Sequence, residues 1–521
     1  MLSFSAAFAL ALLALVIRRA YKVYTAVKSF KDIPRYYVLV DPLNPLSFLL
    51  PIFSWNPGLD QAWKEWDTLY SRYNTEALLY VPLLAGHVSV HCSSPEALRM
   101  VLGDAFLFSK PEKVLALNFM GSNVVASTGE QWRRHRKIAA PAFDNQSYAN
   151  VWEVTSRLYH EMVISEEWKS DDRHYFASFN QFTTRLALLV ISACGFNMHL
   201  RWDESPTRKE LTNPIDSTIV MVSKTVQEKV IFPNWVFRLP IEFLQRMRVA
   251  FADLETFLHN EISAKKAELK NDLHFDGSLS ESNKTVFGRL VAASQQEGAK
   301  GLDDREIAGN LFIFFFAGHE TTAHTLVATL AMLAIHQEEQ NNVYKHIMSV
   351  LGDAEPTFED YNSLAPVLHC FHETIRLFPA AYVMLRSPSE DTAISASKLT
   401  PSSDTVVLPK GTEIVLDIIG AARNPRIYPD PASFKPSRWN APSALDNFLG
   451  FSSGPRVCLG RKFATVEAVC FLTWLLREWK VDVKLDAGET LGSWQQKYLK
   501  PTLGITLKTG DVPLLLTRRS A

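Results

Sequence analysis

The chain has 521 residues, 47% of them hydrophobic, and is therefore long enough to bury a large core. Its 54 basic and 55 acidic residues nearly balance, so there is no electrostatic reason to expect nucleic acid as a partner. The five cysteines are scattered and include no CxxC pair, which is typical of a reducing compartment and excludes a disulfide framework or a zinc knuckle.

An uncharged apolar run covers residues 2–17, and Arg18 and Arg19 follow it directly. The run is near the lower length limit for a membrane-spanning helix. A cleaved signal peptide is disfavoured because the positive charge follows the apolar run instead of preceding it. We predict a membrane anchor over residues 1–20 with one transmembrane helix, and by the positive-inside rule the long C-terminal part stays cytoplasmic. A buried core helix is the alternative.

A proline-rich passage follows over residues 21–58, and it predicts a tether that lies over a surface. From residue 59 to residue 521 most segments have helical periodicity, which predicts a body that is mainly α with a minor β component. A polar stretch at 264–284 predicts a long surface loop between helices.

Strand signals occur in only a few places. Residues 78–92 carry one, and residues 406–417 carry another, in which Pro409–Thr412 would turn a hairpin. Residues 425–439 are crowded with proline and predict an ordered loop without regular structure. Long loops inside a compact body usually carry function.

A long apolar helix is predicted to begin at Asp303, which forms a candidate capping box with Glu306. The middle of this helix contains the polar sequence AGHETT, which includes Glu320 and Thr321. Two interpretations are open at this point: the polar side chains bond to the helix backbone or meet solvent, or they belong to a functional site.

The stretch FSSGPRVCLG presents a single cysteine, Cys458, between two glycines. The residues behind it have helical spacing, so the sulfur lies at the start of a helix, whose dipole and free amides favour a thiolate. Gly454 permits a turn with positive φ, and Gly460 leaves room for a flat group near the backbone. Such a sulfur, with a cation at Arg456 and an aromatic shield at Phe451, fits the proximal ligand of a haem iron.

The same stretch resembles the cytochrome P-450 haem-thiolate enzymes, whose pattern is FxxGxRxCxG. The fixed positions are Phe451, Gly454, Arg456, Cys458 and Gly460. The resemblance covers essentially the whole chain after the tether. It implies the fold of that family and a haem b cofactor with Cys458 as the iron ligand, while the other four cysteines are interpreted as buried core thiols.

Further motifs follow the order of the family. Glu373 and Arg376 match its ExxR pair, which joins an arginine at the position of Arg438. The resemblance implies a structural network that holds the proline-rich loop. The sequence has Trp439 after that arginine, where many members have phenylalanine.

Glu320 and Thr321 stand where the family has an acid and an alcohol that pass protons toward dioxygen through water. The resemblance also implies that the helix crosses above the haem and opens locally near Gly318. His319 is assigned no role.

Trp132 and Arg136 match the WxxxR helix of the family, whose members bond a haem propionate, and Arg386 matches a further propionate arginine. Other basic residues nearby have two open interpretations: a solvated face, or a cationic surface for an acidic electron donor. They are Arg133, Arg134, Lys137, Arg461 and Lys462.

The sequence contains no GxGxxG fingerprint, so the resemblance implies that electrons come from a separate NADPH-dependent cytochrome reductase, with cytochrome b5 as a further donor. It implies a single-pass protein of the endoplasmic reticulum membrane that inserts one oxygen atom from O2 into a lipophilic substrate, in the style of fungal members that oxidise terpenoids or other secondary metabolites. Phe312, Phe315, Phe316 and Tyr382 are candidate pocket walls.

Two alternatives remain open. Some relatives isomerise or dehydrate peroxides without a reductase, and a membrane haem sensor or carrier would have no turnover. Neither needs the acid and alcohol pair, so Glu320 and Thr321 count against both.

Overall fold

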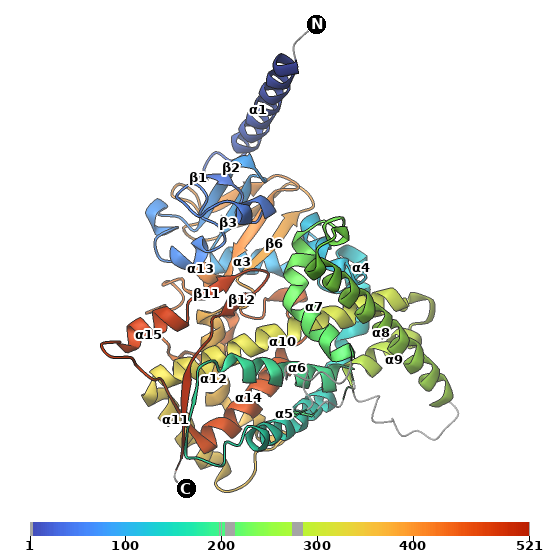
Figure 1. Ribbon diagram of the computed structural model, residues 1–521. Coiled ribbons are helices and arrows are strands. Elements are labelled where there is room, and N and C mark those ends of the chain that lie inside the picture. Colours follow the sequence, from blue (N-terminus) through green and yellow to red (C-terminus); the bar gives the residue numbers. More distant parts are fainter. Residues whose placement is uncertain (1–3, 197, 199–200, 204–213, 273–284, 520–521) are drawn as a thin grey trace. The chain divides into compact units, whose positions relative to one another are not determined.

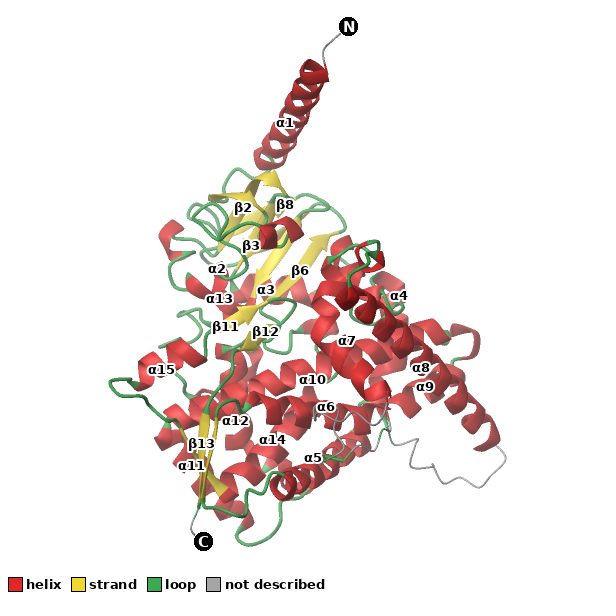
Figure 2. Cartoon of the chain, viewed as in Figure 1, coloured by secondary structure: helices red, strands yellow, loops and turns green. Residues whose placement is uncertain are grey.

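The computed structural model describes residues 4–196, 198, 201–203, 214–272 and 285–519 (Figure 1). The chain divides into two compact units, each described by itself. The first unit comprises Met1–Pro111, Ala381–Ser433 and Asn447–Val457, and the second comprises Glu112–Ala380, Phe434–Asp446 and Cys458–Ala521. Helices dominate and sheets are minor, which confirms the predicted class (Figure 2).

A six-stranded sheet is the centre of the first unit. Its order is β1 (Arg35–Val40), β2 (Ala77–Ala85), β3 (Ser89–Cys92), β9 (Glu413–Asp417), β6 (Val383–Pro388) and β4 (Phe108–Ser109). The strand signal at 78–92 is confirmed as the antiparallel pair β2 and β3. Residues 35–40, placed in the tether by the sequence, instead form β1, and the side chains of Val38 and Val40 are fully buried.

The hairpin predicted for residues 406–417 is wrong. β8 (Thr405–Leu408) pairs with β7 (Thr392–Ser395), whereas β9 lies between β3 and β6. Every residue of β9 is buried, so this strand needs a partner on each side, whereas β8 alternates between exposed and buried residues and suits a two-stranded ribbon.

The helices of the first unit are α1 (Phe4–Lys28), α2 (Gln61–Lys64), α3 (Pro95–Gly103) and α13 (Ile418–Ala422). α1 continues past residue 20, and Arg19 donates to the carbonyls of Leu83 at 3.2 Å and Gly86 at 2.9 Å. In the part of the chain that the structure describes, no helix is both long and apolar enough to cross a membrane, so the predicted span is not found. A span needs about 20 apolar residues, and in α1 the charged residues begin at Arg18.

The second unit is a helical assembly with two small sheets. Its helices are α4 (Gly129–Ala139), α5 (Asn145–Ser165), α6 (Asn180–Phe196), α7 (Pro214–Ile231), α8 (Glu242–Asp272), α9 (Val286–Gln296), α10 (Asp304–Ile335), α11 (Gln337–Leu351), α12 (Ala365–Leu377), α14 (Arg461–Glu478) and α15 (Leu491–Tyr498). The sheets are β10 (Trp479–Asp482), β13 (Leu514–Arg518) and β5 (Arg173–Phe176), and the antiparallel pair β11 (Pro501–Leu503) and β12 (Leu507–Thr509).

α10 runs through the middle of the second unit and packs against α6, α12 and α8 (Figure 1). The predicted capping box is confirmed: Glu306 N donates to Asp303 Oδ1 at 2.8 Å, and Asp303 N donates to Glu306 Oε2 at 3.1 Å. The helix is 32 residues long and apolar on every side, as expected for a helix surrounded by others.

The surface loop predicted for 264–284 begins too early. Residues 264–272 belong to α8, and residues 273–284 lie outside the described part of the chain. The polar sequence was interpreted as a loop, but it forms a helix in which charged side chains are paired. Lys265 lies 3.0 Å from Glu268, and Lys266 pairs with Asp304. The loop predicted for 425–439 contains only a short 3-10 helix, Pro436–Asn440, in its last part.

Candidate functional site

Cys458 is an exposed thiol that precedes α14 in the second unit, and Gly460 is the N-cap of that helix. Its place at a helix start agrees with the sequence prediction. A Cβ built on Gly460 would meet Cys458 Sγ at 4.0 Å and no closer atom of the described residues. The backbone therefore leaves open space beside the sulfur, where a flat group could approach.

The protein alone does not favour the thiolate that the sequence predicts. Burial raises the pKa of Cys458, and this effect outweighs the opposing effects of the Gly460 amide and of the positive charges on Arg136 and Arg461. The Cys458 side chain is nevertheless accessible to solvent. A bound metal cation reverses this balance, because a coordinating thiol is deprotonated outright.

Trp132 and Arg136 lie one turn apart on α4, as predicted. Trp132 is buried, and Arg136 is half-buried and close enough to Cys458 to interact with its charge. Burial lowers the pKa of Arg136, and a negative charge on Cys458 opposes this. The second unit therefore brings a cation to the sulfur.

Most of the cations proposed as a docking surface have acidic partners. Arg133 pairs with Glu130 at 3.0 Å, Arg134 pairs with Glu306, and Lys137 lies 2.7 Å from Glu297. The charges of α4 are thus largely neutralised, which favours the solvated-face interpretation for this helix.

Lys462 contributes differently from the cations of α4. Its ammonium lies 3.2 Å from the ring centre of Tyr361, and burial, with a smaller effect of Arg461, lowers its pKa to about 8. The exposed Arg461 is therefore the stronger cation at the start of α14.

The predicted ExxR network is present in the second unit, and its Glu373–Arg376 pair is fully buried. Arg376 donates to both oxygens of Glu373, at 2.9 Å from Nε and 2.8 Å from a terminal nitrogen. Arg438 Nε donates to Glu373 Oε1 at 3.2 Å. Trp439 Nε1 donates to Glu373 Oε2 at 3.1 Å, so the departure from phenylalanine adds a hydrogen bond. The Lys435 backbone amide also donates to Glu373 Oε1, at 3.0 Å, and so ties the loop backbone to the carboxylate.

Four further predicted residues, Arg386, Phe451, Gly454 and Arg456, lie in the first unit. Gly454 has φ +67°, and a Cβ there would lie 2.4 Å from the carbonyl oxygen of Leu102, so this position requires glycine. Phe451 packs edge-to-face against Phe448 at 6.0 Å. The loop before the cysteine is thus held against α3.

Three cations lie near one another in the first unit: Arg386, which is buried, and Lys110 and Arg456, which are partly buried. Arg386 lies on β6 and is 4% exposed, and burial lowers its pKa to about 10. Burial also lowers the pKa of Lys110 well below its ordinary value, and the nearby Arg386 and Arg456 lower it further. Cations that lie this close together and are partly shielded from water fit an anionic ligand. Sequence reasoning missed Lys110, whose only signal is its place directly after β4, the partner of β6.

On α10 the predicted acid and alcohol are both engaged. Glu320 is 7% exposed; Lys508 Nζ lies 2.5 Å from its Oε1, and Thr506 donates to its Oε2 at 2.5 Å. Thr321 donates its hydroxyl to the Ala317 carbonyl at 2.7 Å. The opening expected near Gly318 is not present, because α10 is helical throughout. Thr506 and Lys508 carry no motif that could have revealed them.

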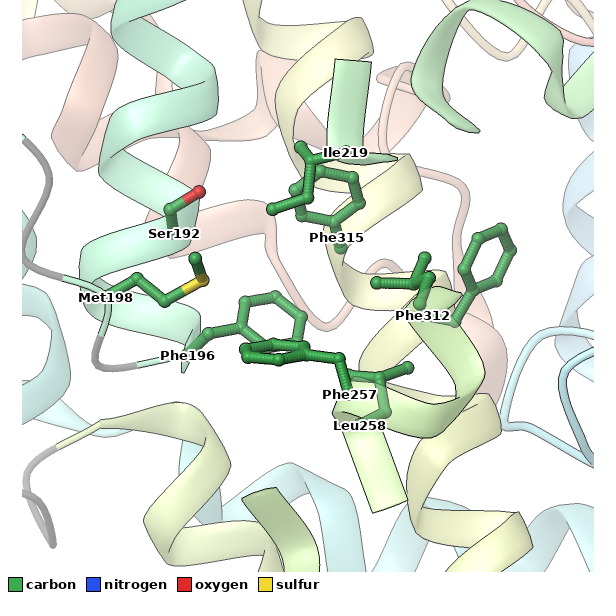
Figure 3. Close-up of a pocket in the computed structure, with 9 residues that line it drawn as sticks. Ser192, Phe196, Met198, Ile219, Phe257, Leu258, Phe312 and Phe315 are labelled. Carbon is green, nitrogen blue, oxygen red and sulfur yellow. The ribbon is translucent and has the colours of Figure 1, made fainter. Parts of the chain in front are cut away.

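A cavity of the second unit is lined by apolar side chains and by Ser192, as far as the described residues go (Figure 3). Phe312 and Phe315, two of the predicted pocket walls, line it, whereas Tyr382 lines a different cavity in the first unit. Phe312 and Thr321 are about two and a half helical turns apart, so they point to opposite faces of α10. This cavity therefore lies on the face of α10 opposite to Thr321.

Comparison with known proteins gives the relationship. The pattern that describes the family Cytochrome P450 matches residues 45–509. "Cytochrome P450 monooxygenase 124" of Postia placenta is 32% identical over 466 residues, which covers 87% of this chain and 88% of that protein. "Cytochrome P450 monooxygenase prx9" of Penicillium rubens is 25% identical, over 81% of this chain and 78% of that protein. "Secologanin synthase 1" of Catharanthus roseus is 27% identical, over 76% and 74%.

The buried ExxR network, the accessible thiol before α14 and the length of the match agree with one another. The chain belongs to the cytochrome P450 family of haem-thiolate monooxygenases.

Proposed function

We propose that this protein inserts one oxygen atom from dioxygen into a lipophilic organic substrate, while the other atom leaves as water. The observation that carries the proposal is the accessible Cys458 sulfur, next to the open space at Gly460 and close to the cation of Arg136. A terpenoid or other secondary metabolite is the substrate class we favour, in line with the fungal monooxygenases to which the chain is similar.

The residues present fit a haem b group. In the second unit the sulfur of Cys458 would bind the iron, and Arg136 with Trp132 would bond a propionate. The first unit by itself carries a group of cations, which includes Arg386 and Arg456 and fits an anionic ligand. Haem with a thiolate ligand supplies the chemistry that cleaves the O–O bond.

The protein's own part in the reaction is the control of protons and water. We infer that the hydroxyl of Thr321, which is partly exposed, and the carboxylate of the buried Glu320 hold and pass protons at α10. Both groups must change partners to do so, because the hydroxyl bonds Ala317 and the carboxylate bonds Lys508. The apolar body of α10 on either side keeps bulk water away.

Changing Thr321 to alanine is expected to raise the hydrogen peroxide released per NADPH consumed, because the hydroxyl no longer passes protons. Haem content should stay unchanged, since the Thr321 hydroxyl bonds to the backbone of its own helix. The control is Thr329→Ala, because Thr329 also donates to the carbonyl four residues before it, at 2.8 Å. Equal peroxide yields in the two variants would contradict the role of Thr321.

Electrons are proposed to come from a separate NADPH-dependent cytochrome reductase, with cytochrome b5 as an additional donor. The test is product formation from lipophilic candidate substrates under labelled dioxygen, with and without reductase. We expect one labelled oxygen atom in the product and no turnover without reductase. Turnover of a peroxide without reductase would instead point to an isomerase or dehydratase, and haem binding without any turnover would point to a sensor or carrier.

We also propose that the protein works at the endoplasmic reticulum membrane with its catalytic part in the cytoplasm. Large apolar side chains are exposed in the first unit; they include Leu46, Leu49, Ile52, Phe53 and Trp55. Apolar side chains gathered in this way favour contact with a lipid surface. Co-sedimentation with microsomal-lipid vesicles checks this, and recovery of all the protein in the supernatant would refute it.

A further inference from the structure

Two side chains of the β11–β12 hairpin hold the carboxylate of Glu320. Lys508, on β12, lies 2.5 Å from Oε1, and Thr506, just before β12, donates its hydroxyl to Oε2 at 2.5 Å. Both carboxylate oxygens are therefore engaged by one hairpin. Charge-assisted hydrogen bonds of this kind are roughly twice as strong as neutral ones.

The hairpin is also docked one turn further along α10. Thr509 N donates to His324 Nδ1 at 3.3 Å, and the Thr509 hydroxyl lies 3.0 Å from the same nitrogen. Burial lowers the pKa of His324 to about 4, so its ring is uncharged near neutral pH and Nδ1 is free to accept. Two points of attachment, Glu320 and His324, prevent the strand from turning about either one.

The tip of the hairpin reaches α7. A Cβ built on Gly504 would lie 2.3 Å from Gln227 Oε1, which means that the backbone at Gly504 packs directly on this side chain. The hairpin thus connects α7 at its tip with α10 at its base. The tip is joined to Lys508 by the pairing of β11 with β12, and the Gly504 amide donates to the Thr506 carbonyl at 3.1 Å.

We propose that Lys508 and Thr506 are positioning residues, which fix the Glu320 carboxylate at one place on α10 and so set the efficiency of the proton relay. This inference rests on the role proposed for Glu320. A carboxylate that is 7% exposed needs a partner, and without Lys508 it would turn toward solvent and leave its place beside Thr321. The other titratable groups close to this ion pair are His319 and His324, and burial lowers the pKa of both.

The test uses three variants of the haem-loaded full chain: Lys508→Met, Lys508→Arg and Lys500→Met. Lys500 is exposed and directly precedes β11, so the last variant removes the same charge next to the same hairpin. The first measurement is hydrogen exchange of the β12 amides. We expect at least about fivefold faster exchange in Lys508→Met, and rates within about twofold of the unsubstituted protein in the other two, because only Lys508→Met breaks the ion pair.

The second measurement is the hydrogen peroxide released per NADPH with reductase and without substrate, with Glu320→Gln as the reference. We expect Lys508→Met to raise the peroxide yield at least about twofold. The double variant Glu320→Gln, Lys508→Met should give nearly the same yield as Glu320→Gln alone, because the two residues act in one network. Lys508→Arg should restore the ordinary yield.

The outcomes separate this inference from the proposed function. A raised yield in Glu320→Gln with unchanged exchange and yield in Lys508→Met overturns the positioning role and leaves the relay intact. An unchanged yield in Glu320→Gln overturns the relay itself. Equal effects of Lys508→Met and Lys500→Met show a general charge effect and also overturn the inference.

Discussion

Replacing Cys458 with serine is expected to abolish the thiolate-type Soret band of the reduced, carbon monoxide-bound protein. A serine hydroxyl is harder than a thiol, remains protonated near neutral pH and is a poor ligand for iron. The start of α14 would still offer open space at Gly460, so some haem could remain without its sulfur ligand. The absorption spectrum of the variant beside that of the unsubstituted protein is the measurement.

The matched control is Cys470→Ser, on α14, the helix that follows Cys458. Cys470 is buried and donates its thiol to the Trp152 carbonyl at 3.5 Å, a bond that a serine hydroxyl can also make. This variant should keep the thiolate-type band. A thiolate-type band in Cys458→Ser, or a histidine-type band in the unsubstituted protein, would contradict the assignment of Cys458 as the iron ligand.

Replacing Arg376 with methionine is expected to lower the free energy of unfolding by about 3–5 kcal/mol, the usual cost of leaving one partner of a buried ion pair uncompensated. Neither side chain of the pair with Glu373 is exposed to solvent, so water cannot replace the lost partner. Chemical denaturation followed by circular dichroism is the measurement. Haem retention should fall too, because Glu373 also holds Lys435 and Arg438 of the loop.

The control for this experiment is Arg133→Met. Arg133 and Glu130 have the same i, i+3 spacing as the Arg376 pair, but their side chains are 61% and 76% exposed. An exposed pair of this kind contributes less than about 1 kcal/mol. If both variants lost the same stability, burial of the Glu373 network would not be what makes it important.

Local patterns in the sequence predicted the features that depend on neighbouring residues. Asp303 and Glu306 cap α10 because they lie within one helical turn, so the side chain of each accepts a hydrogen bond from the backbone amide of the other. Glu373 and Arg376 pair because a spacing of three residues puts them on one helix face. The place of Cys458 at the start of α14 follows from helical periodicity in the same way.

Features that depend on distant parts of the chain were not predictable in this way. β8 and β9 looked like a hairpin, but their partners come from residues 392–395 and from strands β3 and β6. The same holds for Lys508, which meets Glu320 from 188 positions further along the chain. A local residue pattern does not indicate which distant segment of the chain will contact it.

The motif around Cys458 and the order of the other motifs were enough to identify the family, because each motif is a short pattern of residues close together in the chain. The roles assigned to the individual residues stay predictions. The state of these residues depended on packing. Burial raises the pKa of Cys458, although the Gly460 amide at the helix start lowers it. Lys508 and Thr506 of the β11–β12 hairpin engage both oxygens of Glu320. Desolvation and ion pairing arise only when segments far apart in the chain come together, so only the folded chain could decide them.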